Sequence, residues 1–395
     1  MQISSLSSAE EVAGSTDILW GILLRVPLKS LHRLKVVSKR WLTLISNQRF
    51  RKSHSLHHHP RPTSLIFSDG GQSLILSLTT TTTPTLSALN LDFLNQPEVN
   101  VVRSCNGFLL CSSDSGYFVC NPITRDFTTL TLSNHPFKNK TKHLYLAFDP
   151  SISPHYKVIS VVQWDDKWVF HKYSFKPRSW VSPRVSFFTT LYAPYDGVYC
   201  NRAIHWCKGA EFFVYFNVDT MQLRKLPVPL FHRDWDPVWL YRYVHYFGEA
   251  GGRLYLVLAV VAHFIQSDVY DIFEMKENYN GWSLKHRVNL RLILNMQGCT
   301  RVCTRRFTIV RPAKEEKSML ILLVTQETLI LYDLANSRKL CELEIGRTTA
   351  AHIQSNLDIG KVFQYFENTA FVTDKADSTC QLLDFPRLLC CLIPQ

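Results

Sequence analysis

The chain has 395 residues and a formal net charge of +12, from 44 Lys and Arg against 32 Asp and Glu, and 46% of its residues are hydrophobic. These values exclude a disordered or collagen-like chain and predict a protein with a packed core, built as one large domain or two to three average ones. An aromatic content of 12%, with 15 Gly and 18 Pro, favours many short strands joined by turns and excludes a long coiled coil.

No segment reaches the roughly 18 consecutive apolar residues of a membrane-spanning helix, so no membrane partner is expected. The best candidate, Leu254 to Ile265, contains His263 and predicts one or two buried strands instead. The first 17 residues lack a basic stretch followed by an apolar one, which predicts no secretory signal and a nuclear or cytoplasmic protein. Eleven cysteines at irregular positions indicate buried thiols rather than a disulfide framework.

The segment from Ile18 to Pro60 differs in charge from the rest of the chain. It holds nine basic residues and no acidic one, whereas Asp and Glu recur throughout the sequence that follows. A domain boundary is therefore expected near residue 60. The nine basic residues are Arg25, Lys29, Arg33, Lys35, Lys39, Arg40, Arg49, Arg51 and Lys52.

Three short helices are predicted within this segment. Ser15 or Thr16 can cap the first, and Pro27 must end it because a proline pushes the preceding residue out of the helical region. A second helix is expected over residues 28–37, and Ser38 can cap a third. The apolar stripes of the three helices consist of Ile18, Leu19, Ile22, Leu23, Val26, Leu28, Leu31, Leu34, Trp41, Leu44 and Ile45.

About forty residues of helix give too small a core for independent stability. We therefore expect part of the apolar surface of these helices to meet a partner. The alternative that stays open is that the helices dock on the C-terminal part of the same chain.

The run from Asp17 to His54 resembles the F-box, the adaptor-binding module of substrate receptors in SCF (Skp, cullin, F-box) ubiquitin ligases. The matching elements, in order, are ILLRVP (22–27), KSL (29–31), RLKVVSK (33–39), Trp41, LIS (44–46) and Phe50. In this family the apolar residues around the first helix pack against an acidic Skp-type adaptor, which links the receptor to the cullin. The resemblance implies that the basic residues complement the charge of that adaptor.

The resemblance also implies which residues bind the adaptor, although Trp41 above all has the alternative role of holding the helices together. Gly14 and Ser15 stand where family members usually carry Leu-Pro, and Gly21 replaces an acidic residue. A lost Leu anchor removes about 1.5 to 3 kcal/mol of burial, which predicts weakened adaptor binding. The implied adaptor-binding residues are Ile18, Leu19, Ile22, Leu23, Pro27, Leu28, Leu31, Val36 and Trp41.

After residue 60 the sequence becomes strand-like, and one unit recurs: a short apolar strand, often an Asn or Asp, a turn and a further strand. An Asn or Asp side chain at this point bonds the backbone two residues on and so favours a hairpin. Five copies place their landmark residues 212 residues apart from first to last, in four intervals of about 53 each. The landmarks are Asn121, Phe175, Asn217, Met275 and Asp333.

This interval is close to the roughly 50-residue period of kelch-type blades. We therefore expect a mainly β chain, with a small three-helix F-box followed by a kelch-like β-propeller of about six blades; a β-sandwich-like repeat domain is the alternative fold. Tryptophans after residue 60 are expected to pack between blades, with a few exposed. They are Trp164, Trp168, Trp180, Trp206, Trp235, Trp239 and Trp282.

Three blocks, SCNGFLLCSS (104–113), CNPITRDFTTL (120–130) and LAFDPSISPHYKVISV (146–161), resemble the F-box-associated, kelch-like domain of large F-box families in land plants. In that family this domain selects the protein to be ubiquitinated, and nothing in the sequence indicates which protein that is. The expected layout is a flexible N-terminus (1–15), an F-box (16–54), a linker (55–63) and a propeller (64–395).

No phosphate-binding loop, nucleophile elbow or zinc-protease motif is present, so we expect a non-catalytic protein without metal or cofactor. The pair Asp165-Asp166 predicts a solvated hairpin turn. A ligase-independent binding module stays open as an alternative function. Nucleic-acid binding is a weaker alternative, which rests on the basic cluster Arg301, Arg305, Arg306 and Arg311 with Phe307 among them.

Overall fold

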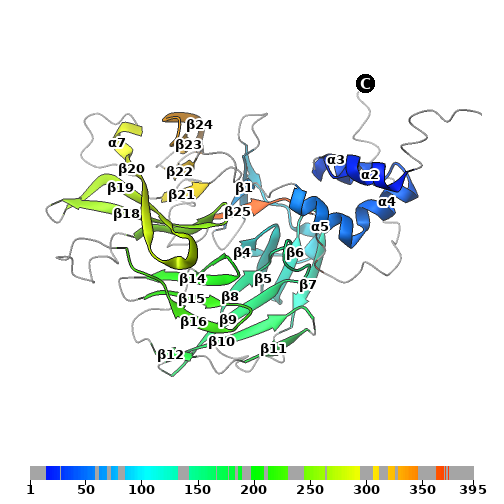
Figure 1. Cartoon of the computed structure of the whole chain (residues 1–395), viewed down its shortest axis with the longest axis horizontal. Coiled ribbons are helices and arrows are strands. Elements are labelled where there is room, and N and C mark those ends of the chain that lie inside the picture. The colour runs from blue at the N-terminus through cyan, green and yellow to red at the C-terminus, as the bar shows by residue number, and fades with distance from the viewer. Residues whose placement is uncertain are drawn as a thin grey trace, which may run out of the picture. The chain divides into compact units, whose positions relative to one another are not determined.

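The structure of the chain is a computed structural model that describes residues 15–26, 28–57, 62–68, 73–78, 85–131, 142–165, 167–176, 178–182, 186–188, 197–208, 212–229, 244–262, 265–293, 306–310, 319–324, 328–345, 362–368, 370 and 372 (Figure 1). The chain divides into two compact units. One comprises Met1–Arg51 with Thr373–Gln395, and the other comprises Lys52–Val372.

The described part of the N-terminal region contains four helices where the sequence predicted three. The first ends earlier than its apolar stripe, at Leu23, because Pro27 disfavours helical backbone ahead of it. The expected helix over residues 28–37 ends at Leu34, and a turn follows it. The helices are α2 (Thr16–Leu23), α3 (Leu28–Leu34), α4 (Lys39–Ser46) and α5 (Gln48–His57).

The helix α5 was missed because its sequence, QRFRKSHSLH, has no apolar stripe. It still contributes Phe50, which is fully buried and meets the Trp20 ring edge-on at 5.1 Å between ring centroids. Both predicted caps are present. The Ser15 hydroxyl accepts a hydrogen bond from the Ile18 amide at 3.4 Å, and the Ser38 hydroxyl accepts one from the Trp41 amide at 3.2 Å.

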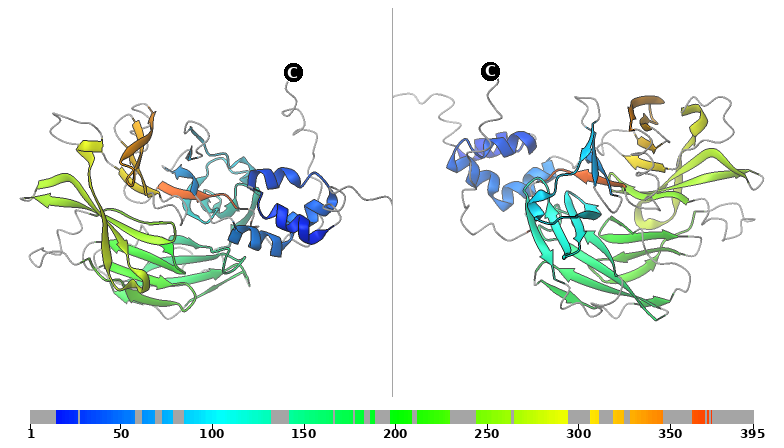
Figure 2. Two further views of the ribbon diagram at one scale, coloured as in Figure 1. Left: turned by 45° about the horizontal axis from the view of Figure 1, so that its top comes forward. Right: turned by 180° about the vertical axis from the view of Figure 1, so that it is seen from behind.

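The strands form six antiparallel sheets, which confirms the expected propeller of about six blades (Figures 1 and 2). We number the blades in chain order and give the strands of each blade from its first strand outward. Blade 1 contains β25 (Val362–Phe366), β1 (Pro62–Phe67), β2 (Leu74–Ser77) and β3 (Leu86–Ala88); blade 2 contains β4 (Asn100–Cys105), β5 (Phe108–Ser113), β6 (Gly116–Asn121) and β7 (Asp126–Leu130); blade 3 contains β8 (Lys142–Ala147), β9 (Lys157–Trp164), β10 (Lys167–Ser174), β11 (Ser179–Val181) and β12 (Ser186–Phe188).

The other three blades have four strands each, and three short helical segments lie in the described parts of the connections between elements. Blade 4 contains β13 (Val198–Cys200), β14 (Ala203–Lys208), β15 (Phe212–Asn217) and β16 (Gln222–Lys225); blade 5 contains β17 (Val244–Ala250), β18 (Arg253–Ala262), β19 (Ile265–Met275) and β20 (Trp282–Asn289); blade 6 contains β21 (Arg306–Val310), β22 (Leu320–Val324), β23 (Thr328–Asp333) and β24 (Arg338–Glu344). The helical segments are η1 (Asp92–Leu94), η2 (Glu277–Tyr279) and α7 (Leu290–Ile293).

All five landmarks of the predicted repeat lie at the end of the third strand of a blade, or one residue after it. The predicted turn chemistry is also present. The side-chain Oδ1 atoms of Asn121, Asn217 and Asp333 each accept a hydrogen bond at 3.0 Å from the amide two residues on. The recurring Asn or Asp therefore starts the outer hairpin of blades 2, 4 and 6.

Each pair of neighbouring blades shares one apolar cluster, so six clusters close the ring. Trp168 and Trp206 are buried between blades 3 and 4, as expected, and Trp180 and Trp282 pack partly buried against two other clusters. Trp164 is one of the few expected to be exposed, since it is 43% exposed at the end of a strand. Trp235 and Trp239 lie outside the described residues.

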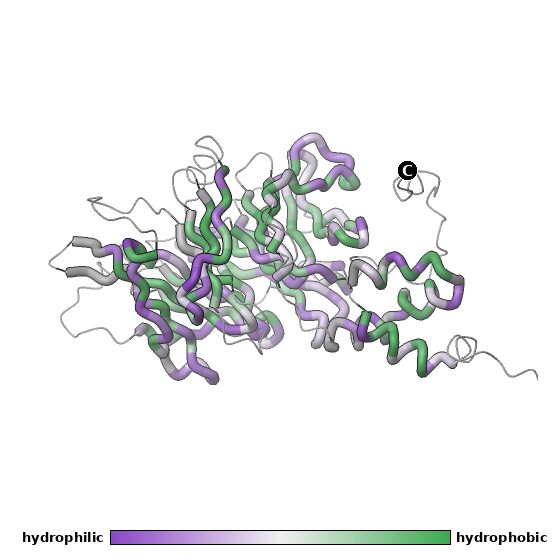
Figure 3. The backbone as a smooth tube through the Cα atoms, turned by 90° about the horizontal axis from the view of Figure 1, so that it is seen from above, coloured by the Kyte–Doolittle hydropathy of each residue, from purple (hydrophilic) through white to green (hydrophobic). Residues whose placement is uncertain are grey.

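The strand β18 shows why the run from Leu254 to Ile265 is almost continuously apolar. Alternate residues of a strand point to opposite sides of the sheet. Tyr255 and Val257 enter the cluster shared with blade 6, whereas Leu254 and Leu256 enter the cluster shared with blade 4. Both faces of a central strand are therefore buried, and Figure 3 shows apolar stretches along the strands of the propeller.

The ring is closed by pairing between two strands that lie far apart in the sequence. The strand β25 pairs antiparallel with β1, so blade 1 takes its first strand from the C-terminal part of the chain. Gln364 of β25 donates a hydrogen bond at 2.5 Å to the carbonyl of Glu249 and one at 3.3 Å to that of Ile309, while its own carbonyl accepts one from Ser104 at 2.9 Å. Three other blades thus hold the closing strand.

The residues that follow β25 are held by the NPITRD block of blade 2, which is part of a block that carried the family resemblance. The fully buried Asn121 side chain donates to Asn368 Oδ1 at 2.9 Å and to the Ala370 carbonyl at 2.8 Å. Asp126 accepts a hydrogen bond from the Val372 amide at 2.9 Å. Gly107 has a φ of +89°, and a Cβ at this position would lie 2.2 Å from Asn368 Nδ2.

A second resemblance block interlocks blades 2 and 3. Phe108 stacks on Phe148 with ring centroids 4.1 Å apart, and Asn106 donates a hydrogen bond to the Phe148 carbonyl at 2.7 Å. The Tyr156 ring meets Phe108 edge-on at 6.0 Å. The distinctive residues of the blocks therefore hold neighbouring blades and the closing segment together.

The connections between strands differ in length, and the blade-to-blade connections all lie on one face of the propeller. Because strands alternate in direction, turns after the first and third strands of a blade lie on one face, and connections after the second and fourth lie on the other. The turns after the third strand have four residues in blades 2, 3, 4 and 6, whereas all connections from one blade to the next have nine to eighteen. The blade-to-blade connections are 89–99, 131–141, 189–197, 226–243, 290–305 and 345–361.

Replacing Asn121 by Ala should destabilise the propeller more than the same change at Asn217. Both changes remove a turn hydrogen bond, but only Asn121→Ala also removes the hydrogen bonds that the side-chain amide donates to Asn368 and Ala370 of the closing segment. The extra loss is expected to be about 1 to 3 kcal/mol of the free energy of unfolding. Urea unfolding followed by tryptophan fluorescence measures both variants, and equal losses would show that the closing segment contributes little.

Stability of the propeller should fall as the pH is lowered from about 6.5 toward 4. Burial lowers the pKa of His143, His171, His205 and His245 to about 4, from an ordinary value of 6.5. The unfolded chain therefore binds protons in this range that the folded chain does not, and their stabilising contribution is complete only above pH 6.5. Glu249 acts in the opposite direction because burial raises its pKa to about 7.

Burial and the neighbouring Lys285 also lower the pKa of His286. Thermal unfolding midpoints at pH 7.5, 6.5, 5.5 and 4.5 test the balance between these five histidines and Glu249. His205→Asn should flatten the decline, because His205 is fully buried and holds Tyr279 through a 3.0 Å hydrogen bond. A midpoint that rises as the pH falls would contradict the assignment of neutral histidines to the folded state.

Candidate adaptor-binding surface and an ion cluster on the propeller

The residues implied as adaptor contacts divide into a buried and an exposed group. Leu19, Leu23 and Leu31 are at most 1% exposed and form the core of the helical unit with Ile45 and Phe50. Trp41 is half-buried against the same core. These side chains hold the helices together, and their role as adaptor contacts stays a prediction.

Three residues of the implied set lie on the surface. Ile18 is 49% exposed, Ile22 is 42% exposed and Val36 is 69% exposed. Ile18 and Ile22 are four positions apart on α2, so they share one face of that helix. Pro27 lies outside the described residues, and Leu28 begins α3 with its side chain outside the description.

Sequence reasoning did not select Val37, which follows Val36 in the turn after α3 and is 56% exposed. Two adjacent exposed valines in a short helical unit are an apolar surface without cover from that unit's core. The sequence did contain a signal for this exposure. Val36 and Val37 lie in the last turn of the helix expected over residues 28–37, and two adjacent residues of a helix cannot both face the same core.

Gly21 lies inside α2, where nothing within 4 Å would meet a Cβ. Its carbonyl accepts a hydrogen bond at 3.2 Å from Arg25, one turn further on. Arg40 of α4 donates to the Thr16 hydroxyl at 2.8 Å and so ties α4 to the start of α2. Arg51 likewise donates to the carbonyl of Ser46, so at least three of the nine basic residues contribute to the helical unit itself.

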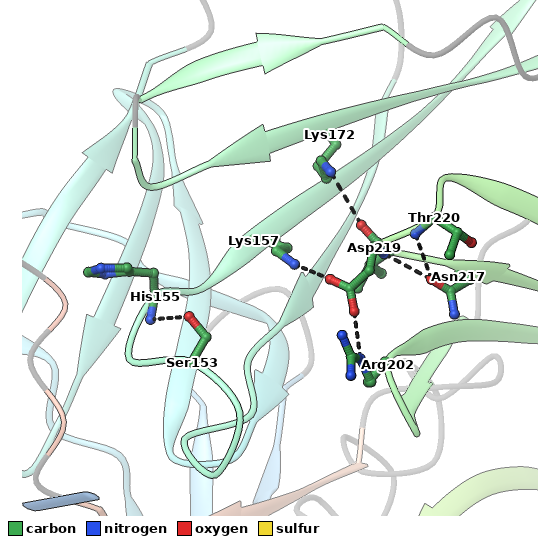
Figure 4. Close-up of polar contacts among 9 residues, drawn as sticks. Ser153, His155, Lys157, Lys172, Arg202, Asn217, Asp219 and Thr220 are labelled. Atoms are coloured by element: carbon green, nitrogen blue, oxygen red, sulfur yellow. Dashed lines mark hydrogen bonds and ion pairs between the residues drawn. The ribbon is translucent and has the colours of Figure 1, made fainter.

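A cluster of charged side chains lies at the boundary of blades 3 and 4 (Figure 4). Asp219, in the turn after β15, binds Lys157 of β9 through Oδ1 and Arg202 through Oδ2, with 2.6 Å between Arg202 Nε and Oδ2. Lys172 of β10 donates to the carbonyl of Val218 at 3.4 Å. All these groups lie on the face that carries the turns after the first and third strands.

The cluster is partly open to solvent. The Lys157 and Asp219 side chains are 29% and 25% exposed, and the Arg202 side chain is 52% exposed. Burial raises the pKa of Asp219, but the hydrogen bonds from Lys157 and Arg202 outweigh it and hold that pKa below its usual value. Burial and then the neighbouring Lys157 lower the pKa of Lys172. The carboxylate is thus held ionised beside an excess of cations.

Sequence reasoning singled out three other groups. Asp165 lies in the turn between β9 and β10 and has a left-handed backbone conformation, as predicted for a hairpin turn. Asp166 lies outside the described residues. In the basic cluster, Arg306 starts β21, and the other three arginines also fall outside the description.

The described cysteines are free thiols, with Cys105, Cys111, Cys120 and Cys200 buried and Cys207 and Cys341 half-buried. Within the described ranges, no three His, Cys, Asp or Glu side chains gather as a metal site would. No helix in the part of the chain that the structure describes has the length and apolarity to cross a membrane.

Comparison with protein families gives two matches that agree with the two units. Residues 15–53 match the F-box domain, and residues 72–241 match the F-box associated beta propeller domain. Together with the six blades, these matches define a class of protein in which an F-box precedes a propeller.

Relatives from Arabidopsis thaliana define the family further. F-box protein At5g07610 is 31% identical over 313 residues, which cover 72% of this chain and 73% of the relative. F-box protein At5g49610 is 34% identical over 120 residues, which cover 30% of this chain and 32% of the relative. The chain belongs to the F-box protein family.

Solved structures with a similar course of the chain include a nidogen/laminin complex. The match has 11% sequence identity and a TM-score of 0.39, and it covers 76% of this chain and 96% of the other.

Gly21→Ala should stabilise α2, because the added methyl group meets no other atom and alanine loses less backbone entropy than glycine in a helix. The expected gain of about 0.5 to 1 kcal/mol corresponds to roughly two- to fivefold slower hydrogen exchange of the α2 amides. Ser15→Ala is the opposing control, since it removes the cap of the same helix. Faster exchange in Gly21→Ala would contradict the helical assignment of this segment.

Proposed function

We propose that this F-box protein is the substrate-recognition subunit of an SCF-type ubiquitin ligase. Its F-box would bind a Skp-type adaptor, and through it a cullin, while its propeller would bind the target protein. The family membership and the two-unit architecture support this assignment.

One observation carries the adaptor half of the proposal. The helical unit fills its own core with five buried residues and still leaves Ile18, Ile22, Val36 and Val37 between 42% and 69% exposed. Burial of exposed aliphatic side chains is the main favourable term in protein association. These four residues are therefore the anchors that a partner of the helical unit would cover.

Charge supports the same partner. The region from Ile18 to Pro60 has nine basic residues and no acidic one, and the F-box resemblance implies an acidic adaptor. Complementary charge mainly speeds encounter and fixes orientation, whereas the apolar anchors supply the affinity.

The proposed mechanism is proximity. A target held near a ubiquitin-charged conjugating enzyme reacts as if the reaction were intramolecular, because translational and rotational freedom has already been lost. This chain would contribute no catalytic group, and the chemistry would take place on other subunits. We expect it to act in the nucleus, the cytoplasm or both.

A ligase-independent binding module is the second candidate. It is favoured by Gly14 and Ser15, which replace the Leu-Pro start that the family usually carries. In the structure, the Ser15 side chain caps α2. This position therefore stabilises the helix and does not provide an apolar anchor for a partner.

Ile22→Asp should abolish co-elution of the full chain with a Skp-type adaptor at about 0.15 M salt. Loss of one buried aliphatic anchor corresponds to about 1.5 to 3 kcal/mol, or at least tenfold weaker binding. Ile152→Asp is the matched control, because Ile152 is an isoleucine of the propeller that is exposed to a similar degree, 45% against 42%.

Retained binding by Ile152→Asp and lost binding by Ile22→Asp would support the receptor assignment. Leu23→Asp should also fail, but through unfolding of the helical unit, since Leu23 is fully buried. Circular dichroism separates the two causes. If the unaltered chain does not co-elute with the adaptor, the receptor assignment is wrong and the ligase-independent module remains.

A further inference from the structure

The turn that carries Arg202 has an unusual residue for its backbone. Two-residue turns join the first and second strands of blades 2, 4 and 5, and both residues of each turn have a positive φ. Glycine occupies the second position in blades 2 and 5, as Gly107 and Gly252, but in blade 4 the residue is Arg202, with a φ of +64°. A side chain in this conformation costs about 1 to 2 kcal/mol.

The Arg202 side chain does not recover this cost through burial, because it is 52% exposed. It instead joins Lys157 on the Asp219 carboxylate, and a partly exposed ion pair contributes little to stability. A strained residue whose side chain is accessible and charged points to a role in binding.

The charges of the cluster do not balance. Three cations, Lys157, Lys172 and Arg202, surround the single carboxylate of Asp219, and Lys172 meets a carbonyl oxygen rather than an anion. The excess of cations also contributes to the lowered pKa of Lys172, because burial and the neighbouring Lys157 both disfavour its charged form. Asp149 is the next acidic group that acts on Arg202, and its Oδ1 already accepts hydrogen bonds from the amide and hydroxyl of Ser151.

Figure 4 shows the three cationic side chains converging on the turn that holds Asp219, from strands of blade 3 and from the first turn of blade 4. An anionic group placed beside Lys172 and Arg202 would neutralise the remaining charge and accept charge-assisted hydrogen bonds. A planar guanidinium is well suited to a carboxylate or phosphate, which it can bind through two parallel hydrogen bonds.

We infer that the cluster of Lys157, Lys172, Arg202 and Asp219 binds an anionic oxygen group, a carboxylate or a phosphate, on an acidic segment of the target protein. The inference rests on the proposed function for the source of that group. Asp219 orients the cations, while Lys172 and Arg202 contact the ligand.

The test uses the full chain and a fluorescein-labelled hexapeptide of alternating Asp and Glu, with a Gly-Ser hexapeptide as the neutral probe. Fluorescence anisotropy should show binding of the acidic peptide alone. Arg202→Gly and Lys172→Met should each weaken this binding about tenfold, as expected for the loss of one charge-assisted hydrogen bond. Arg202→Gly should also relieve the strained turn, so that the variant folds.

Arg287→Gln is the matched control, because Arg287 is 61% exposed and binds Asp271 through both oxygens, on an outer strand of blade 5 away from the cluster. It should bind the acidic peptide as the unaltered chain does. Competition by inorganic phosphate at a lower concentration than acetate would indicate a phosphorylated target segment, and equal competition would indicate a carboxylate.

Two results would overturn the inference. One is binding of the acidic peptide that is no stronger than that of the neutral probe. The other is unchanged binding in both Arg202→Gly and Lys172→Met, which would make the cluster a link between blades 3 and 4. Adaptor co-elution of the same samples is an independent readout, so a chain that binds the peptide but not the adaptor would refute the proposed function and leave this inference standing.

Discussion

Closure of the ring is the constraint on which the propeller depends. Each of the six apolar clusters is shared by two blades. An open ring would therefore expose to water the apolar sides through which blade 1 and blade 6 meet. The pairing of β25 with β1 prevents this, and Asn121 and Asp126 hold the segment that follows β25. Distinctive residues of the blocks after the F-box, such as Asn121 and Phe108, thus stabilise the architecture.

The fold was largely predictable from the sequence, because the outer hairpin of a blade has a local cause. Asn121, Asn217 and Asp333 fix the end of a third strand through bonds to their own backbone, and their spacing gives the blade length. Blade 1 left no repeat in the sequence, because its strands come from the two ends of the propeller. The helix α5 escaped prediction for a different reason, since the described residues it buries are Phe50 and a polar one, His54, which do not form an apolar stripe.

The candidate sites were less predictable than the fold. An apolar stripe identifies residues that avoid water, but it does not separate Leu23, which fills the core of the helical unit, from Ile22, which remains exposed one position away. That distinction depends on how the helices cross. The ion cluster had no signal at all, because Lys157, Arg202 and Asp219 are separated in the sequence and meet only when blades 3 and 4 pack.

The pairing of β25 with β1 also has a consequence for synthesis of the protein on the ribosome. Some 300 residues separate the two strands, and at about 5 to 20 residues per second they are made roughly 15 to 60 seconds apart. During this interval the helices of the F-box are already outside the ribosome, while blade 1 still lacks its first strand. A nascent or prematurely terminated chain would thus carry an F-box without a finished propeller, so the timing of translation separates the appearance of the F-box from the closure of the propeller by β25.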